Sequence, residues 1–242
     1  MSLAIKVLNV GRINYGTALK LQEYFAKKHL NKKDNSNIVL LLEHNPVYTV
    51  GIRNSNFSIQ EEERLKLLGA DFYHTNRGGL ITFHGPGQLI TYPILNLKDF
   101  KLTMRCYVSN LEKMVISICS NLGLTAYTCQ HTGVWINDKK VCAIGVHGSR
   151  YITTHGLALN CSLDVLRWFE HIIPCGLEGK GVTSLTQEMK KNYSVRDAAA
   201  AMTISFCETF KCNFVDFSRE EAAFIMESVL DCADAKSTHQ KV

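Results

Sequence analysis

The stretch Arg77-Gly78-Gly79-Leu80-Ile81-Thr82-Phe83-His84-Gly85-Pro86-Gly87-Gln88 carries the most information about the fold and the function of this chain. Four glycines and one proline surround an arginine, a threonine, a histidine and a glutamine. Glycine lets a backbone turn freely and approach a bound molecule closely, so the polar side chains between these glycines predict the lining of a binding site. A second interpretation stays open at this point, a tight hairpin rimmed by solvated polar groups, because clusters of Gly and Pro usually mark turns.

A second informative segment is His171-Ile172-Ile173-Pro174-Cys175-Gly176-Leu177, followed by Gly179-Lys180-Gly181-Val182-Thr183-Ser184-Leu185. A lone cysteine is usually a small buried apolar residue. Cys175 instead stands between Pro and Gly at the end of an apolar run, where few side chains shield it. This context makes Cys175 the one cysteine of the chain that we interpret as a candidate for chemistry.

Three further motifs lie between these segments: Thr132-Gly133-Val134-Trp135, Lys139-Lys140-Val141-Cys142-Ala143-Ile144-Gly145 and Thr153-Thr154-His155-Gly156-Leu157-Ala158-Leu159-Asn160. In this type and order, the blocks closely resemble the LipB-type octanoyltransferases, also called lipoyl(octanoyl) transferases, over residues 5 to 215. Residues 168 to 176 are similar to the animal mitochondrial members of that family.

The resemblance implies an α+β fold, with a mixed β-sheet flanked by helices. This is the fold shared by biotin and lipoate protein ligases and related to that of class II aminoacyl-tRNA synthetases. We expect residues 1–217 to form the octanoyltransferase (catalytic) domain and residues 218–242 to form a C-terminal helix and a frayed tail. A shift in composition near residues 186–194 leaves open that a smaller helical part begins there.

Hydrophobic periodicity locates the elements. Apolar runs predict strands over residues 5–10, 38–43, 72–75, 89–95, 134–136, 141–147, 151–154 and 157–161. Spacing of three and four residues and capping signals predict helices over residues 15–29, 60–68, 108–122, 194–210 and from 218 to about 230, with residues 234–242 frayed.

The resemblance implies that Cys175 and Lys140 form a catalytic dyad. A thiol has an ordinary pKa of about 8.5 and reacts as the thiolate, which a nearby ammonium group stabilises. Cys175 would attack the octanoyl thioester of acyl carrier protein, and a lysine amine of a lipoyl domain would then take the acyl group as an amide. Without the resemblance, Lys140 has the sequence context of an ordinary turn lysine beside Lys139.

The resemblance also implies a set of substrate-binding residues, namely Arg77, Gly78, Gly79, Leu80, Ile81, Thr82, Phe83, His84, Ala143, Ile144, Gly145, Gly156, Leu157 and Ala158. Backbone N–H groups beside Cys175 and within Ala143–Gly145 are candidates for stabilising an oxyanion. His84 is either a second acid–base group or a structural imidazole bonded to the backbone. His147 and His155 are expected as supporting residues.

We expect no cofactor, no ATP and no metal, since the donor thioester is already activated. The implied partners are octanoyl-acyl carrier protein, with its phosphopantetheine arm, and lipoyl-domain proteins such as the glycine cleavage H protein and 2-oxoacid dehydrogenase E2 subunits. The net charge of +5 fits either a solvated surface or a basic docking face for an acidic partner. Nucleic acid is disfavoured, because basic residues form no long stripe, and no apolar run approaches the roughly 20 residues that span a bilayer.

Nine cysteines without a CxxC pair argue against a disulfide framework and a structural zinc site, and favour a reducing compartment. The resemblance implies a mitochondrial location, or a cytoplasmic one if the source is bacterial. Residues 1–22 are basic and lack acids, but the elements predicted there make a cleavable address weak or absent. Three alternatives remain: an ATP-dependent lipoate or biotin protein ligase, a non-catalytic module that binds acyl groups or lipoyl domains, and a zinc protein.

Overall fold

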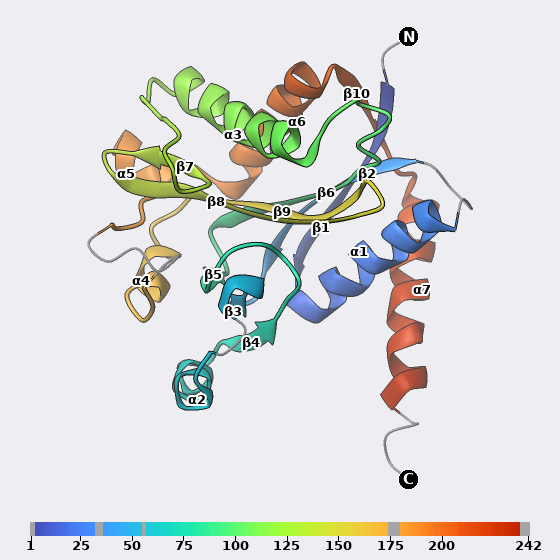
Figure 1. Cartoon of the computed structure of the whole chain (residues 1–242), viewed down its shortest axis with the longest axis horizontal. Helices are drawn as coiled ribbons and strands as arrows, with labels where there is room; N and C mark the ends of the chain where they lie inside the picture. The colour runs from blue at the N-terminus through green and yellow to red at the C-terminus, as the bar shows by residue number, and fades with distance from the viewer. Residues whose placement is uncertain (1–2, 32–35, 55–56, 174–179, 238–242) are drawn as a thin grey trace.

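A seven-stranded mixed sheet forms the centre of the computed structural model (Figure 1), which describes residues 3–31, 36–54, 57–173 and 180–237, the last seven by their backbone only. Its strands lie in the order β10-β1-β2-β6-β9-β8-β7. The pairs β10–β1 and β1–β2 are parallel and all the others are antiparallel. The strands are β1 (Leu3–Ile13), β2 (Asn37–His44), β6 (Gln88–Ile94), β7 (Val134–Ile136), β8 (Lys139–Ser149), β9 (Ile152–Asn160) and β10 (Cys212–Asp216).

Helices cover both faces of this sheet, which is why the central strands β2 and β6 are buried along nearly their whole length. The helices α3 (Met104–Asn121) and α6 (Val195–Phe210) share one hydrophobic cluster with the sheet. On the opposite face, α1 (Tyr15–Leu30) and α7 (Arg219–Ser237) share a second cluster. A capping box formed by Ser194 and Asp197 begins α6, where capping signals in the sequence predicted the start of a helix.

A small three-stranded sheet, ordered β4-β3-β5, lies beside the main sheet. It consists of β3 (Val47–Val50), β4 (Asp71–His74) and β5 (Thr82–His84) and is joined by a 3₁₀ turn (Ile52–Asn54), α2 (Ile59–Leu67) and α4 (Leu166–Phe169). A further short helix, α5 (Leu185–Met189), follows residues 180–184. The small sheet packs on a third hydrophobic cluster. Its strand β5 is part of the Gly-rich segment, residues 77–88, and so places that segment against β8 and β9.

The structure confirms the predicted α+β class with a mixed sheet flanked by helices, and it differs from several of the predicted element boundaries. The strands predicted over 151–154 and 157–161 form the single strand β9, because its pairing with β8 runs without a break from Ile152 to Leu159. The last helix continues to Ser237, beyond the predicted end near residue 230, so residues 234–237 are helical where fraying was predicted.

Residues 186–194 do not separate off a helical part in the described chain. Side chains of α6 and the first residue of β10 belong to the same hydrophobic cluster as α3, β8 and β9. In α7, Ile225 and Val229 are buried in the cluster that also holds residues of α1. The division at residue 217 stays a prediction. None of the described helices combines the length and apolarity that a bilayer crossing needs.

Candidate active site

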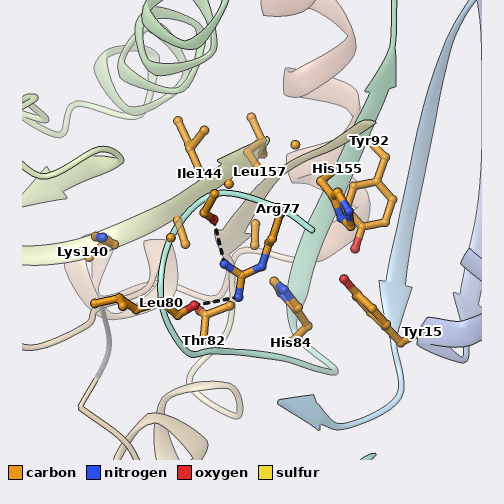
Figure 2. Close-up of a pocket in the computed structure, with 16 residues that line it drawn as sticks. Tyr15, Arg77, Leu80, Thr82, His84, Tyr92, Lys140, Ile144, His155 and Leu157 are labelled. Atoms are coloured by element: carbon orange, nitrogen blue, oxygen red, sulfur yellow. Dashed lines mark hydrogen bonds between the residues drawn. The ribbon is translucent and has the colours of Figure 1, made fainter. Parts of the chain in front are cut away.

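A cavity of about 50 Å³ lies where the Gly-rich segment meets β8 and β9 (Figure 2). All the predicted substrate-binding residues except Ile81 and Phe83 line this cavity, and so does Lys140. The residues that complete its lining are Tyr15, Tyr92 and His155. Three segments that are far apart in the sequence therefore share one cavity, and a lysine reaches it.

Ile81 and Phe83 lie outside the cavity because side chains alternate along a strand. Thr82 and His84 line the cavity, whereas Ile81 and Phe83 are buried in the cluster beneath the small sheet. There the ring of Phe83 stacks on Trp168 with centroids 4.8 Å apart. The sequence prediction took the whole block and did not separate the two faces.

Two of the predicted glycines are needed for the close approach of neighbouring backbone. A Cβ atom on Gly145 would lie 2.9 Å from the carbonyl oxygen of Gly78. A Cβ on Gly156 would overlap the carbonyl oxygen of Thr91 and lie 2.8 Å from Cδ of Pro93. The strand β7 pairs with β8 only as far as Cys142, which leaves the rest of that edge to the Gly-rich segment, where Gly78 donates to the Val146 carbonyl at 3.0 Å.

Arg77 is a buried residue that holds the Gly-rich segment in place. Its Nη2 atom donates to the carbonyl oxygens of Thr49 at 2.7 Å and Leu80 at 2.9 Å, and Nη1 donates to Gly78 O at 3.0 Å. Gln88 at the other end of the segment is also buried. The segment is therefore not a hairpin rimmed by solvated polar groups.

The histidines at the cavity are held neutral by burial. Desolvation, then the nearby His44 and the Arg77 guanidinium, lower the pKa of His84 well below its ordinary value. Desolvation, followed by Arg77, lowers the pKa of His155 to about 3. The Nδ1 atom of His84 lies 2.8 Å from Oε1 of Gln88, so its partner is a side chain and not the backbone.

Lys140 is buried, unlike an ordinary turn lysine. Its ammonium group donates to the carbonyl oxygen of Thr132 at 3.2 Å and lies 4.8 Å from the centroid of the Trp135 ring. Its backbone N–H donates to Gly181 O, and its carbonyl accepts from Thr183 N, both at 3.0 Å. The chain that follows residues 174–179 is therefore hydrogen-bonded to the strand that carries Lys140.

Cys175, the other member of the predicted dyad, lies outside the described residues together with Gly176. The described chain resumes at Lys180, whose ammonium group lies 5.2 Å from the centroid of the same Trp135 ring. The seven cysteines that the structure describes are free thiols. Burial raises the pKa of Cys119 and of Cys161 to about 12, which makes these two poor nucleophiles.

Sequence reasoning missed Tyr15 and Tyr92. Tyr15 is the first residue of α1, and Tyr92 lies in β6, where its hydroxyl is 2.9 Å from Nε2 of His44. Both are buried aromatic residues and look like core residues in the sequence. Within the described residues, no group of three or more His, Cys, Asp or Glu side chains is placed to hold a metal ion.

The sequence profile of the lipoyl protein ligase A/B catalytic domain matches residues 14–207 of the chain. The chain belongs to this family. Every residue that lines the cavity falls inside the matched range.

Several named relatives of this family are similar to the chain over most of its length. An octanoyl-[acyl-carrier-protein]:protein N-octanoyltransferase LIPT2, mitochondrial, from Danio rerio is 53% identical over 210 residues, which cover 86% of this chain and 93% of the relative. Its Homo sapiens counterpart of the same name is 41% identical over 223 residues, covering 88% and 96%. An octanoyltransferase from Bacteroides fragilis is 46% identical over 174 residues, covering 69% and 78%. These relatives confirm the predicted resemblance to octanoyltransferases, including the animal mitochondrial forms.

Solved structures of lipoate ligases share the fold. A putative lipoate protein ligase from T. acidophilum with bound lipoic acid superposes with a TM-score of 0.70 at 14% identity, covering 95% of each chain. A lipoate-protein ligase A bound with ATP gives a TM-score of 0.68 at 14% identity, covering 96% of this chain and 95% of that one. The family therefore has the predicted lipoate-ligase fold, and at this identity the likeness speaks for the fold alone.

Proposed function

We propose that this protein transfers an octanoyl group from octanoyl-acyl carrier protein to a lysine of a lipoyl domain, the first step of endogenous protein lipoylation. The observation that carries the proposal is the single cavity that joins the Gly-rich segment, Ala143–Gly145 and Gly156–Ala158 to a buried lysine. The relatives named octanoyltransferases, at 41% and 53% identity, support it. Relatives with these names favour octanoyl transfer over an ATP-dependent ligase or a non-catalytic binding module.

The transfer proceeds in two steps through Cys175. Its thiolate attacks the thioester carbonyl, the C–S bond to the carrier's pantetheine breaks, and the pantetheine thiolate leaves while octanoyl-Cys175 forms. The amine of the acceptor lysine then attacks this new thioester, an amide bond forms, and the Cys175 thiolate is released. Exchange of one thioester for another is nearly neutral in free energy, whereas conversion to an amide is downhill, so no ATP is needed.

We assign two roles to Lys140, stabilising the negative charge of the Cys175 thiolate and transferring protons. Its ammonium stabilises the Cys175 thiolate before the first step and then gives a proton to the leaving pantetheine thiolate. The neutral amine that remains accepts the proton that the attacking lysine sheds, which restores the ammonium. Backbone N–H groups near the reacting carbonyl stabilise the oxyanion of each tetrahedral intermediate. No metal or cofactor enters this scheme.

The lining of the cavity suits an acyl chain. Lys140 and Leu80 lie at one end, Ile144 and Leu157 lie in the middle, and Tyr15 and Tyr92 lie at the other end (Figure 2). Each buried methylene contributes about 0.8 kcal/mol to binding. The thioester end of the chain is therefore assigned to Lys140 and the methyl end to the tyrosines. At about 50 Å³ the cavity holds only a few waters at roughly 10–15 Å³ each, so side chains in its wall move when the chain binds.

The assigned partners are the acyl carrier protein as donor, and lipoyl domains of the glycine cleavage H protein and of 2-oxoacid dehydrogenase E2 subunits as acceptors. The net charge of +5 favours an acidic docking partner. A bi-partite lipoate protein ligase described together with its E2 lipoyl domain shares the fold with a TM-score of 0.71. We assign the protein to mitochondria, because animal relatives carry that location in their names.

A transfer assay tests this function. Octanoyl-acyl carrier protein and an unmodified lipoyl domain are incubated with the protein without ATP, and the mass of the lipoyl domain is measured. We expect one octanoyl group to be added. Cys175→Ser should abolish transfer, and Lys140→Met should slow it about 10²–10⁴-fold, the usual contribution of a general acid–base group.

The matched controls are Cys106→Ser and Lys139→Met, since both side chains are exposed and do not line the cavity. Both should retain wild-type rates. Product formed only from free octanoate and ATP would favour the ligase alternative. Binding of the carrier protein without any transfer would favour the binding module.

A further inference from the structure

A chain of buried hydrogen bonds connects His84 in the cavity to Thr183. Nδ1 of His84 contacts Oε1 of Gln88 at 2.8 Å, and Nε2 of Gln88 donates to Oδ1 of Asn160 at 2.8 Å. Nδ2 of Asn160 then donates to the carbonyl oxygen of Thr183 at 2.9 Å. All four residues are buried, with Gln88 and Thr183 wholly inaccessible to solvent.

The bond to Thr183, at the end of this series, fixes the donor and the acceptor of every other hydrogen bond in it. A backbone carbonyl can only accept, so the atom of Asn160 that meets Thr183 O is the amide nitrogen. The Asn160 oxygen then accepts from the nitrogen of Gln88, which lies also 3.3 Å from Phe83 O, a second acceptor. The oxygen of Gln88 is left to face His84, and because it can only accept, Nδ1 of His84 must carry the proton.

The other ring nitrogen of His84 is therefore an acceptor. Among the described residues, Nε2 of His84 has no hydrogen-bond partner, and the residue lines the cavity. The ring packs against Tyr15, to which it is parallel with centroids 6.2 Å apart, and against His44 at 6.0 Å, and these two rings also contact each other at 5.0 Å. Burial lowers the pKa of His84, and the second nitrogen stays unprotonated near neutral pH.

We infer that Gln88 and Asn160 are positioning residues, which lock His84 in the Nδ1–H tautomer and leave Nε2 as a neutral acceptor at the tyrosine end of the cavity. The tautomer follows from the hydrogen bonds alone, whereas the effect of His84 on octanoyl transfer rests on the proposed function. Thr183 also donates its N–H to the carbonyl of Lys140. The series of hydrogen bonds that orients His84 therefore ends on the strand that carries Lys140.

Nitrogen-15 NMR of the histidine rings tests the tautomer directly. His84→Asn identifies the His84 signals by their loss. In the wild type we expect a protonated Nδ1 and an unprotonated Nε2 from pH 6 to 8. Gln88→Leu removes the acceptor and should shift His84 toward the Nε2–H tautomer. Gln88→Glu, as the protonated acid, keeps a donor to Asn160 Oδ1 and an acceptor for His84, so it should keep the proton on Nδ1.

His44 is an internal control, because its Nδ1 lies 3.2 Å from the carbonyl oxygen of Ile13 and does not depend on Gln88. Its signals should not change in either variant. A wild-type His84 with the proton on Nε2 would overturn the inference, and so would a Gln88→Leu variant with an unchanged tautomer. If Gln88→Leu does not fold, the spectra of the wild type and of Gln88→Glu still show which nitrogen of His84 carries the proton.

A kinetic measurement separates positioning from mere stability. Gln88→Leu should lower kcat/KM for octanoyl transfer about fivefold or more, the loss of one neutral hydrogen bond, at temperatures where the fold is intact. Gln88→Glu should recover part of the rate. If no transfer is found while the NMR result holds, the proposed function fails and the tautomer assignment stands. If transfer is found while the tautomer is wrong, only the present inference fails.

Discussion

Lys140 reaches the cavity because the residues before it leave room for its side chain. Gly133 has a φ of +127°, and a Cβ atom there would lie 2.6 Å from Cys142 O and 3.3 Å from Cε of Lys140. The carbonyl of Thr132 and the ring of Trp135 then receive the ammonium group. Residues 132–135 therefore support the side chain of Lys140, a role that could not be predicted from their sequence.

This support predicts the effect of changing Trp135. Trp135→Leu removes the aromatic face and should lower the rate of octanoyl transfer by about 2- to 30-fold, corresponding to the roughly 0.5–2 kcal/mol of a cation–π contact. Trp135→Phe keeps a ring and should lose less. The rate of transfer is measured well below the melting temperature of each variant. Equal rates in the two variants would show that the aromatic face does not contribute to the placement of Lys140.

The glycines and Lys140 were predictable as site residues through motif resemblance, whereas Tyr15 and Tyr92 were not. An aromatic residue at the start of a helix and one within an apolar strand match the ordinary core pattern. Their place beside the cavity depends on how α1 packs across the sheet, which no local spacing records.

At the level of elements, the approach of β6 to β9 depends on Gly156. Gly156→Ala would press a methyl group against Thr91 O and Pro93 Cδ. We expect a loss of about 1–3 kcal/mol in the free energy of unfolding, or about 2–4 °C in Tm for each kcal/mol in a chain of this size. Thermal unfolding measures it.

Gly181→Ala is the matched control, because its Cβ would meet Lys139 Cγ at 3.6 Å, an ordinary contact. It should change Tm little. A Gly156→Ala variant as stable as this control would contradict the close packing that we assign to β6 and β9.

Long periodic elements were predictable, whereas only some of the short ones were. The capped helix α6 follows its pattern closely, because its own sequence carries the start signal and the buried face. The buried face of α3 was predicted as well, but the helix begins at Met104 and not at residue 108. The strands β3, β5 and β10 were missed. β5 is only three residues long and interrupts a Gly-rich segment, and β10 is only five residues long and partly exposed, so neither has a sufficient apolar period. Their pairing partners, and not their sequences, make them strands.

For the whole molecule, three buried neutral histidines predict a dependence of stability on pH. Burial lowers the pKa of His44 to about 4 and of His155 to about 3, and that of His84 well below its ordinary value. The unfolded chain, with histidine pKa values of about 6.5, binds more protons in the window below that value, so the free energy of unfolding falls as the pH falls. This contribution of the histidines to the free energy of unfolding is fully present above about pH 6.5.

Each such histidine contributes a slope of up to about 1.4 kcal/mol per pH unit within that window. Urea unfolding at about pH 5 and pH 7 measures the effect. His44→Asn, which does not titrate but keeps a polar group near Ile13 O and Tyr92, should reduce the slope. Equal stability of the wild type at the two pH values would contradict the neutral burial of these rings.

The account as a whole depends on an acyl group passing through Cys175, the residue that lies outside the described part of the chain. The most direct test is to mix the protein with octanoyl-acyl carrier protein in the absence of a lipoyl domain, quench with acid, and locate the added mass by peptide mapping. We expect one octanoyl group on the peptide that contains Cys175, lost on adding hydroxylamine and transferred on adding a lipoyl domain. An octanoyl group on another residue, or a protein that stays unmodified while it transfers octanoate to the lipoyl domain, would contradict the account.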